Sequence, residues 1–486
     1  MNTLMNKSIS ELHSLLVKGE VTASDLVEDC IARIEKDPCN CFEAKAYDQA
    51  RKEAAKITEV GEDEYLKGIP FLCKDNYSTK GIETTASSNI LNGYVPLYDA
   101  TLVTKLKRAG MILVAKTSMD ELAMGGTGTT SHKGVTTNPY DHERIAGGSS
   151  SGSAAALALG IAPFATGSDT GDSTRKPASN TGIVGYKPTW GRVSRYGLFP
   201  FATSMDAIGY FTRNVLDASY VLSAIAGHDK NDMSSSSRKK EKYEEYVLKG
   251  KTLKRVGYFK AVMEDLNDGP IKESWVSLLN TLSQQGYEVI EYDYPRELLN
   301  AIYPVYMIIS CAEATSNNAN LDGIRFGPKP EGTQKTYQEY MTEARTAGFS
   351  DLIKRRFVIG SFSLLSANQD EMFSRAQKAR RLIVENMNDF FDSIDYLIQP
   401  AAYHIPPKID ELSSKWSAEP DFLDNILVIG NFGGYPSITL PMTYDNGMPI
   451  GINVTGRIFE DGYVFGMASE IEKMTGIHDV TVKEDR

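Results

Sequence analysis

Apolar segments of strand length alternate with helical segments through the first quarter of the chain, and this alternation restricts the fold most. Residues 10–36 predict two helices, with Ser10 and Thr22 available to cap their starts. Residues 68–74 and 111–115 predict buried strands separated by a helical segment. Alternation of this kind indicates an α/β fold with a central mixed, mostly parallel sheet covered by helices on both faces.

The pattern changes after about residue 228. Residues 229–242 are polar, include four consecutive serines and predict a surface loop. Beyond them we expect one continuing core, so that residues 1–486 form a single large domain with a helical insertion region at 295–395. The later segments that predict strands or a long helix are 255–259, 287–292, 369–392, 436–441 and 450–454.

The composition is that of a globular protein with an acidic balance. Of 486 residues, 41% are hydrophobic and 24% are charged, and the net charge is −11. Such a chain is a poor candidate for holding nucleic-acid phosphates, unless a local basic patch or a partner protein does so. The five cysteines form no Cys-x-x-Cys pair, and no segment resembles a signal peptide or a membrane span. We therefore expect a cytoplasmic protein.

Glycines and serines are concentrated between residues 147 and 175. This segment begins Gly-Gly-Ser-Ser-Ser-Gly-Ser, continues as an alanine-rich helical pattern, and ends Gly-Ser-Asp-Thr-Gly-Asp-Ser-Thr-Arg. Glycine lets the backbone approach a ligand closely and turn several N–H groups toward one point. A serine held among such donors is a candidate nucleophile with its own oxyanion site, and Ser149 and Ser173 are both candidates.

No obvious proton acceptor adjoins these serines in sequence. Only His132 and His142 of the six histidines are near the segment, and we interpret both as surface or turn residues. Lysine can act as the base where burial lowers its pKa. Lys74 follows the apolar residues 70–73, so its stem is expected to be buried. The alternative is a strand-end lysine that pairs with a carboxylate, and Asp75 follows it directly.

Other motifs in the chain are incomplete. Asp169-Thr-Gly matches the local signature of aspartic proteases, but no second copy is present to share a proton. Gly250-Lys-Thr lacks the first glycine of a phosphate-binding loop, because Glu245 stands there. Residues 126–128 supply only part of a dinucleotide-binding fingerprint.

Taken together, Lys74, Ser149 and Ser173 resemble the Ser-Ser-Lys triad of the amidase signature family. The family's signature corresponds here to residues 147–153 and 167–171, followed by Ser173, Arg175 and Pro177. The resemblance implies that neutral Lys74 accepts a proton from Ser149, which accepts one from the nucleophile Ser173.

The same resemblance extends to the loops around the triad. It implies a cis peptide bond at the relay serine Ser149. It also implies that the backbone N–H groups of Thr170, Gly171 and Asp172 form the oxyanion hole.

Within the family, the chain resembles the A subunits of tRNA-dependent amidotransferases over nearly its whole length. This resemblance implies hydrolysis of glutamine and transfer of the ammonia to B and C subunits, where mischarged Glu-tRNA(Gln) or Asp-tRNA(Asn) is amidated. It implies no cofactor or metal in this chain, ATP and Mg²⁺ on a partner protein, and tRNA contact mainly through the partner. The segments that carry it begin at Gly191, Ser204, Glu313, Asp322, Lys354 and Asn431.

Glutamine recognition requires groups for its α-carboxylate and its α-ammonium. The resemblance points to Arg356 for the carboxylate and Asp424 for the ammonium, with Tyr306 lining the same pocket. Arg355 is an alternative to Arg356, and core packing is an alternative role for Tyr306.

Two departures from the family pattern stand out. Asp172 occupies a position where most relatives have glycine, and our hypothesis is that its side chain points away from the oxyanion and makes a structural hydrogen bond. Residues 125–131 lack a Glu-Asn pair that is usual in the A subunits. A free-standing amidase acting on small amides and a non-catalytic binding module are the competing functions.

Overall fold

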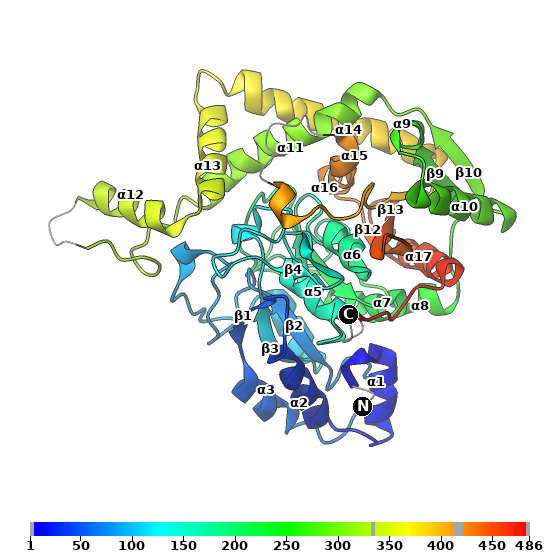
Figure 1. Ribbon diagram of the computed structural model, residues 1–486, viewed down its shortest axis with the longest axis horizontal. Helices are drawn as coiled ribbons and strands as arrows, with labels where there is room; N and C mark the ends of the chain where they lie inside the picture. Colours follow the sequence, from blue (N-terminus) through cyan, green and yellow to red (C-terminus); the bar gives the residue numbers. More distant parts are fainter. Residues whose placement is uncertain (1–3, 332–335, 413–420, 483–486) are drawn as a thin grey trace.

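The computed structural model describes residues 4–331, 336–412 and 421–482. Its centre is an 11-stranded mixed sheet with helices on both faces (Figure 1). The α/β class and the mixed sheet confirm the expectation from the sequence. In spatial order the strands are β1 (Phe42–Lys45), β3 (Ile112–Thr117), β2 (Pro70–Lys74), β6 (Ala165–Asp169), β8 (Ala207–Thr212), β7 (Val184–Lys187), β12 (Ser437–Asp445), β13 (Met448–Gly456), β11 (Tyr396–Pro400), β9 (Arg255–Phe259) and β10 (Glu288–Tyr292).

The expectation that the sheet is mostly parallel is wrong. Parallel pairing occurs at β3–β2–β6 and at β11–β9–β10. The pairings of β1 with β3 and of every neighbour from β6 to β11 are antiparallel. The antiparallel centre includes the hairpin of β12 and β13, whose two-residue turn is Asn446-Gly447 with positive φ at both positions. A separate two-stranded sheet joins β4 (Thr137–Asn138) and β5 (Asp141–Ile145).

Helices surround the sheet. Short 3-10 or π segments are also present: η1 (Leu4–Asn6), η2 (Asn89–Leu91), η3 (Glu121–Ala123), η4 (Asp370–Ser374) and η6 (Ile426–Val428). The α-helices are α1 (Ile9–Val17), α2 (Ala23–Ile34), α3 (Tyr47–Ala54), α4 (Thr101–Arg108), α5 (Ser151–Ala158), α6 (Arg175–Thr181), α7 (Val215–Ile225), α8 (Glu244–Leu248), α9 (Lys260–Asp265), α10 (Pro270–Gln284), α11 (Arg296–Asn317), α12 (Tyr337–Gly348), α13 (Asp351–Leu364), α14 (Arg375–Ser393), α15 (Phe422–Asn425), α16 (Ile429–Phe432) and α17 (Asp461–Thr475).

Capping boxes start the first two long helices. Thr22 caps α2 as expected, but Ser8 rather than Ser10 caps α1, with Glu11 as the reciprocal partner. Ser10 lies inside α1, where its hydroxyl donates a hydrogen bond to Asp217 (3.2 Å).

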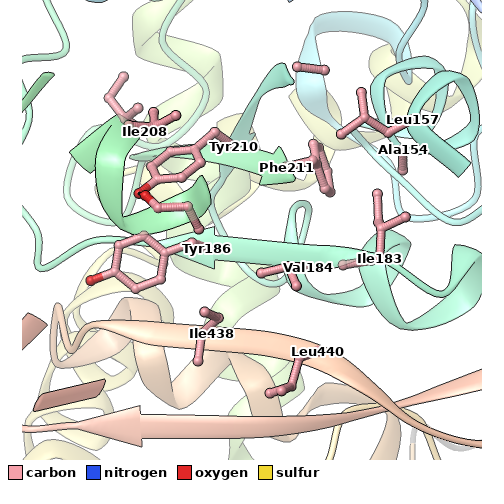
Figure 2. Close-up of a cluster of buried hydrophobic side chains, with 14 of the residues drawn as sticks. Ala154, Leu157, Ile183, Val184, Tyr186, Ile208, Tyr210, Phe211, Ile438 and Leu440 are labelled. Carbon is pink, nitrogen blue, oxygen red and sulfur yellow. The ribbon is translucent and has the colours of Figure 1, made fainter. Parts of the chain in front are cut away.

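The core lies on both faces of the central strands. Successive strand residues point to opposite faces of a sheet. In β8, a Cβ at Gly209 would lie 2.1 Å from Thr174 Oγ1, so α6 starts close against this face. The next residue, Tyr210, points the other way and donates a hydrogen bond to the carbonyl of Ala218 in α7 (2.7 Å). Figure 2 shows the apolar side chains that α5, β7, β8 and β12 contribute to this region.

Helices dominate residues 295–395, where a helical insertion region was expected. Within that range lie α11 to α14, and α11 packs against α13 and α14 (Figure 1). By length and composition alone α11 could cross a membrane, but Leu299, Ile302 and Ile309 are buried in the hydrophobic core, as in the core helix of a globular protein. Residues 229–242 form neither helix nor strand. The assignment of the whole chain to one domain stays a prediction.

Candidate active site

Two parallel strands place the candidate residues at one edge of the sheet. Lys74 ends β2 and Asp169 ends β6, and these strands are direct neighbours in parallel register. The carboxyl ends of adjacent parallel strands lie at the same edge of a sheet. The loops that precede α5 and α6 meet there too, because the Ser150 N–H donates to the Ser173 carbonyl (3.2 Å).

Lys74 is fully buried among hydroxyl groups. Its Nζ donates hydrogen bonds to the Oγ atoms of Ser149 (2.8 Å), Ser150 (2.9 Å) and Ser168 (2.8 Å). Within the described ranges Lys74 has no ion pair, whereas Asp75 pairs with Lys116 at 3.1 Å. The alternative of a strand-end lysine paired with a carboxylate is therefore wrong.

This environment disfavours the charged form of the lysine. Burial lowers the pKa of Lys74 from 10.5 to about 7, against the opposing effect of the Asp120, Asp169 and Asp206 carboxylates. Hydroxyl groups solvate an ammonium less well than water does, and no carboxylate of the described residues compensates for the lost hydration at hydrogen-bonding distance. A substantial fraction of neutral amine near pH 7 makes Lys74 able to accept a proton.

Ser149 contacts Lys74 directly, and Ser173 lies on the neighbouring loop. The Gly148–Ser149 peptide bond is cis, as expected, and the Ser149 carbonyl accepts a hydrogen bond from the Asp120 N–H (3.0 Å). Ser173 is 5% exposed. Among the hydrogen bonds of the described residues, none joins the Ser149 and Ser173 hydroxyls. The structure thus links Lys74 to Ser149 directly, and Ser173 to their loop through the backbone.

Unpaired backbone donors adjoin Ser173. No acceptor in the described part of the chain is hydrogen-bonded to the N–H groups of Thr170, Gly171 or Asp172. The Gly171 carbonyl, in contrast, accepts a hydrogen bond from the Arg175 guanidinium (2.7 Å). Free N–H groups next to a serine are what an oxyanion hole requires.

Asp169 is part of the support beneath this loop. It forms a fully buried ion pair with Arg175 (2.8 Å). Although burial acts to raise it, the Arg175 guanidinium holds the pKa of Asp169 below its usual value. Arg175 also donates to the Leu427 carbonyl (2.7 Å) and to Asn431 Oδ1 (2.6 Å), which brings the C-terminal part of the chain to the site. Asp169 is therefore ionised, and both of its oxygens already accept hydrogen bonds. It cannot share a proton as a carboxylate of an aspartic protease does.

Tyr306 and Arg356 adjoin the loop from the helical region. A Cβ at Gly171 would lie 3.2 Å from ring atoms of Tyr306, so the tyrosine packs directly over the proposed donors. Arg356 lies 5.7 Å from the Phe201 ring, and its Nε is buried without a hydrogen-bond partner among the described residues. Arg355, one position earlier on α13, is exposed. These positions favour Arg356 over Arg355 as a substrate ligand.

Asp424 lies near α6 on the short helix α15. Its Oδ1 is 3.6 Å from Lys176 Nζ and 2.9 Å from His404 Nε2. Its side chain is 46% exposed, so it is open to a ligand from solvent. The charge of Asp424 reaches Asp172, whose pKa it helps to raise. The structure therefore brings Asp424 into the electrostatic neighbourhood of the candidate nucleophile.

Asp172 differs from the sequence-based hypothesis. Its carboxylate accepts no hydrogen bond among the described residues, so the expected structural hydrogen bond is not formed. Burial raises the pKa of Asp172 to about 6, opposed by Lys176 and supported by Asp169. The side chain is half-buried and also affects Tyr306, whose pKa is raised first by burial and further by the Asp172 charge.

Sequence reasoning missed three contributors. Ser150 and Ser168 hydrogen-bond to Lys74, and Ser168 Oγ also accepts from Asn76 (2.9 Å). The period-two pattern of β6 could have indicated Ser168, since it shares a strand face with Thr166, which hydrogen-bonds to the Lys74 N–H. Asp120 had no signal in the sequence.

Asp120 organises residues 125–131, the second departure from the family pattern. Its carboxylate accepts hydrogen bonds from the N–H groups of Thr127 (3.1 Å), Gly128 (3.0 Å) and Thr130 (3.2 Å). A Cβ at Gly148 would lie 1.9 Å from Asp120 Oδ2, which explains the glycine before Ser149. The segment thus supports the loop that carries Ser149.

His132 and His142 lie outside this arrangement. His132 contacts Glu43 (3.1 Å) and His142 contacts Thr137 (3.0 Å), and in the described part of the chain neither hydrogen-bonds to Ser149 or Ser173. Over residues 4–331, 336–412 and 421–482, no cluster of three or more histidine, cysteine, aspartate or glutamate side chains has a metal-binding arrangement.

Comparison with known proteins agrees with this site. Residues 25–465 match the family model described as amidase. The chain is 38% identical to the A subunit of glutamyl-tRNA(Gln) amidotransferase from Heliobacterium modesticaldum, over 98% of both chains. The A subunit of the same enzyme from Listeria innocua is also 38% identical over 98% of both chains.

Solved structures show the same fold. The crystal structure of the A subunit of glutamyl-tRNA(Gln) amidotransferase from Thermotoga maritima has a TM-score of 0.79 at 33% identity, covering 97% of this chain and 96% of that one. The peptide amidase from Stenotrophomonas maltophilia has a TM-score of 0.81 at 26% identity, covering 97% of both chains. The buried lysine among serines, the serine-glycine loops and the full-length likeness lead to one conclusion: the chain belongs to the amidase family.

Proposed function

We propose that this chain is the glutamine-hydrolysing component of a tRNA-dependent amidotransferase. The observation that carries the proposal is the contact of Lys74 with Ser149, because a buried lysine without a carboxylate partner is a base for a serine relay. Near full-length identity of 38% to proteins named for this complex supports the choice within the family.

The proposed reaction begins with two proton transfers. Ser149 gives its hydroxyl proton to neutral Lys74 and takes the proton of Ser173, whose Oγ attacks the side-chain amide carbon of glutamine. No hydrogen bond joins the Ser149 and Ser173 hydroxyls in the described part of the chain. Such catalytic contacts often tighten only when substrate binds.

Charge develops on the amide oxygen as the new C–O bond forms. The N–H groups of Thr170, Gly171 and Asp172 are proposed to receive it, each donor contributing about 3–4 kcal/mol by analogy with measured oxyanion holes. The proton on Lys74 then returns through Ser149 to the amide nitrogen, and ammonia leaves. Water attacks the acyl-enzyme by the same route and releases glutamate and Ser173.

Glutamine is proposed to bind between two charged side chains, Arg356 and Asp424. Arg356, with its buried Nε that has no partner among the described residues, suits the α-carboxylate, and Asp424 suits the α-ammonium. Tyr306 would cover the reacting amide, since its ring packs against Gly171.

Ammonia is proposed to pass to partner B and C subunits. The acidic charge of −11 fits this arrangement, because the partner would bind the tRNA phosphates. ATP and Mg²⁺ are proposed to act on the partner, with no cofactor in this chain, and the assembly is proposed to be cytoplasmic. The product would be Gln-tRNA(Gln) or Asn-tRNA(Asn).

The decisive experiment purifies the protein from its own cells with the partners it carries. We expect glutamine hydrolysis, stimulated by mischarged tRNA and ATP, and amidation of Glu-tRNA(Gln) or Asp-tRNA(Asn) when each is supplied separately. Ser173→Ala should lower hydrolysis by roughly 10⁴-fold or more, and Ser236→Ala, in the surface loop, should leave it unchanged. Glutamine hydrolysis unaffected by Ser173→Ala would instead favour a non-catalytic binding role.

A free-standing amidase is the second candidate. Its support is the TM-score of 0.81 to a peptide amidase, comparable to the 0.79 to an amidotransferase component. This alternative predicts full activity of the isolated chain on small amides and no response to tRNA. Co-purification with partners and tRNA-stimulated glutamine hydrolysis would exclude it.

A further inference from the structure

The carboxylate of Asp172 is the feature of this site that the proposed reaction leaves unused. Asp172 directly precedes the proposed nucleophile, and its carbonyl accepts a hydrogen bond from the Lys176 N–H (2.9 Å) at the start of α6. No hydrogen bond reaches its carboxylate in the described part of the chain. A half-buried carboxylate without a donor is poorly stabilised and would gain from a cationic ligand.

The groups around Asp172 come from three helices. Lys176 on α6 and Asp424 on α15 interact with it electrostatically, as do Asp169 and Arg175 beneath the loop. Tyr306 on α11 faces the same charge. Lys176 also pairs loosely with Asp424 at 3.6 Å.

Two carboxylates therefore share one nearby lysine at the rim of the site. After burial, the like charge of Asp424 helps to raise the pKa of Asp172, against the effects of Lys176 and Arg175. Asp424 itself contacts Lys176 and His404, whereas no hydrogen bond of the described residues reaches the Asp172 carboxylate. A positive charge beside Asp172 would stabilise its ionised form. An ammonium suits this place, because its N–H groups can donate to both carboxylates.

We propose that Asp172 and Asp424 together bind an ammonium group of the amide substrate, so that Asp172 selects amides that carry a positive charge. This inference rests on the proposed function, to which it adds a second carboxylate for substrate recognition. It also gives a reason for tolerating a carboxylate beside an oxyanion hole.

The selection has a repulsive and an attractive part. With a neutral or anionic amide bound, the Asp172 charge opposes the negative charge that develops on the oxyanion and slows the reaction. A substrate ammonium neutralises that charge and adds its own hydrogen bonds. The same residue thus disfavours one substrate class and favours the other, which is an efficient source of specificity.

Arg356 supplies the positively charged group of the proposed selection. It flanks Tyr306 and Phe201, and its charge lowers the pKa of Tyr306 against the effect of burial. A substrate with an α-carboxylate toward Arg356 and an α-ammonium toward Asp172 matches both side chains. An α-amino acid amide such as glutamine has this charge pattern.

The test compares glutamine with glutaramate, which is glutamine without its α-amino group. Both are assayed with the protein in its native assembly, as wild type, Asp172→Asn and the control Asp268→Asn, whose carboxylate is 97% exposed and distant in sequence. We expect Asp172→Asn to lower the glutamine-to-glutaramate ratio of kcat/KM by about tenfold, the scale of one charged hydrogen bond. Glutaramate hydrolysis itself should rise.

A pH series supplies a readout that a purely structural role would not move. Because the pKa of Asp172 is about 6, its carboxylate is charged above that pH and protonated below it. The wild-type ratio should therefore fall as the pH drops from about 7.5 to about 5.5, a window centred near that pKa, and the Asp172→Asn ratio should stay flat. Protonation of Lys74 slows the hydrolysis of both substrates equally, so its effect on kcat/KM cancels in the ratio.

Each outcome decides one of the two claims. Wild-type protein that hydrolyses no glutamine would overturn the proposed function, and this inference with it. Glutamine hydrolysis with a ratio that changes less than about threefold in Asp172→Asn would overturn the inference alone, since one charged hydrogen bond is worth more than that. Equal loss on both substrates would likewise show that Asp172 only maintains the loop.

Discussion

At the scale of single residues, Lys74 shows how burial converts an ordinary cation into a base. Three serine hydroxyls surround its Nζ, yet the described residues supply it with no ion pair. Desolvation therefore dominates the pKa of Lys74 and lowers it to about 7. The same lysine beside a carboxylate would stay charged and could not accept the serine proton.

This pKa predicts the pH dependence of the reaction. Because neutral Lys74 is the active form, kcat/KM for glutamine should rise about tenfold per pH unit up to about pH 7 and then level off. Lys74→Arg, which stays protonated, should lower kcat/KM by roughly 10²–10⁴-fold at every pH. Lys249→Arg, on the surface, is the matched control. Steady-state kinetics between about pH 5.5 and about pH 9 measure both, and a flat wild-type profile would contradict the assignment.

At the scale of elements, short loops rather than helices or strands hold the reacting groups. Strands β2 and β6 deliver Lys74 and Asp169 to one edge, and the loops before α5 and α6 carry Ser149 and Ser173. Asp120 binds the third loop, residues 127–130, through backbone N–H groups. One buried carboxylate thereby determines the shape of the surface on which the Ser149 loop rests.

Removing that carboxylate tests the dependence. In Asp120→Asn the side chain keeps its shape but offers one acceptor oxygen in place of two, and its amide faces N–H donors. We expect the free energy of unfolding to fall by about 1–3 kcal/mol and kcat/KM to fall with it. Denaturant titration and glutamine hydrolysis provide the measurements, with Asp29→Asn as a second aspartate-to-asparagine variant away from the site. An unchanged unfolding midpoint would show that Asp120 is not required.

At the scale of the whole molecule, one buried arginine ties distant parts of the chain together at the active site. Arg175 binds Asp169 and Gly171 near the proposed nucleophile and reaches Leu427 and Asn431, which lie 252 and 256 positions later. The central sheet likewise draws strands from both halves of the chain. The loop that carries Ser173 therefore depends on folding of the C-terminal part.

The buried Arg175–Asp169 pair gives a prediction for stability. Arg175→Met leaves Asp169 as an unpaired buried charge, so the free energy of unfolding should fall by about 3–5 kcal/mol. The double variant Arg175→Met/Asp169→Asn removes that charge and should recover part of the loss. Denaturant unfolding of both variants tests this, and a double variant less stable than the single one would refute the explanation.

The local pattern of the chain was sufficient for much of the site. The apolar residues before Lys74 predicted a strand end and a buried stem, because such runs cannot stay in water. The serine-glycine loops, and their resemblance to a known family, predicted roles for Ser149 and Ser173 and for the N–H donors. Periodicity predicted some of the strands, such as β2, β3, β9 and β13, but not β1, β6, β7, β8 or β11. All of these depend on neighbours within a few positions.

Only the tertiary structure decided which distant groups meet. Sequence spacing does not specify which hydroxyl groups surround Lys74 or which backbone N–H groups bind the Asp120 carboxylate. Nor does it specify that the Asp172 carboxylate accepts no hydrogen bond among the described residues. The antiparallel centre of the sheet was equally hidden, since strand direction depends on how elements pair. By itself the sequence determined which residues can do the chemistry. Their protonation and substrate preference depend on burial and nearby charge, which arise only when the folded chain excludes water.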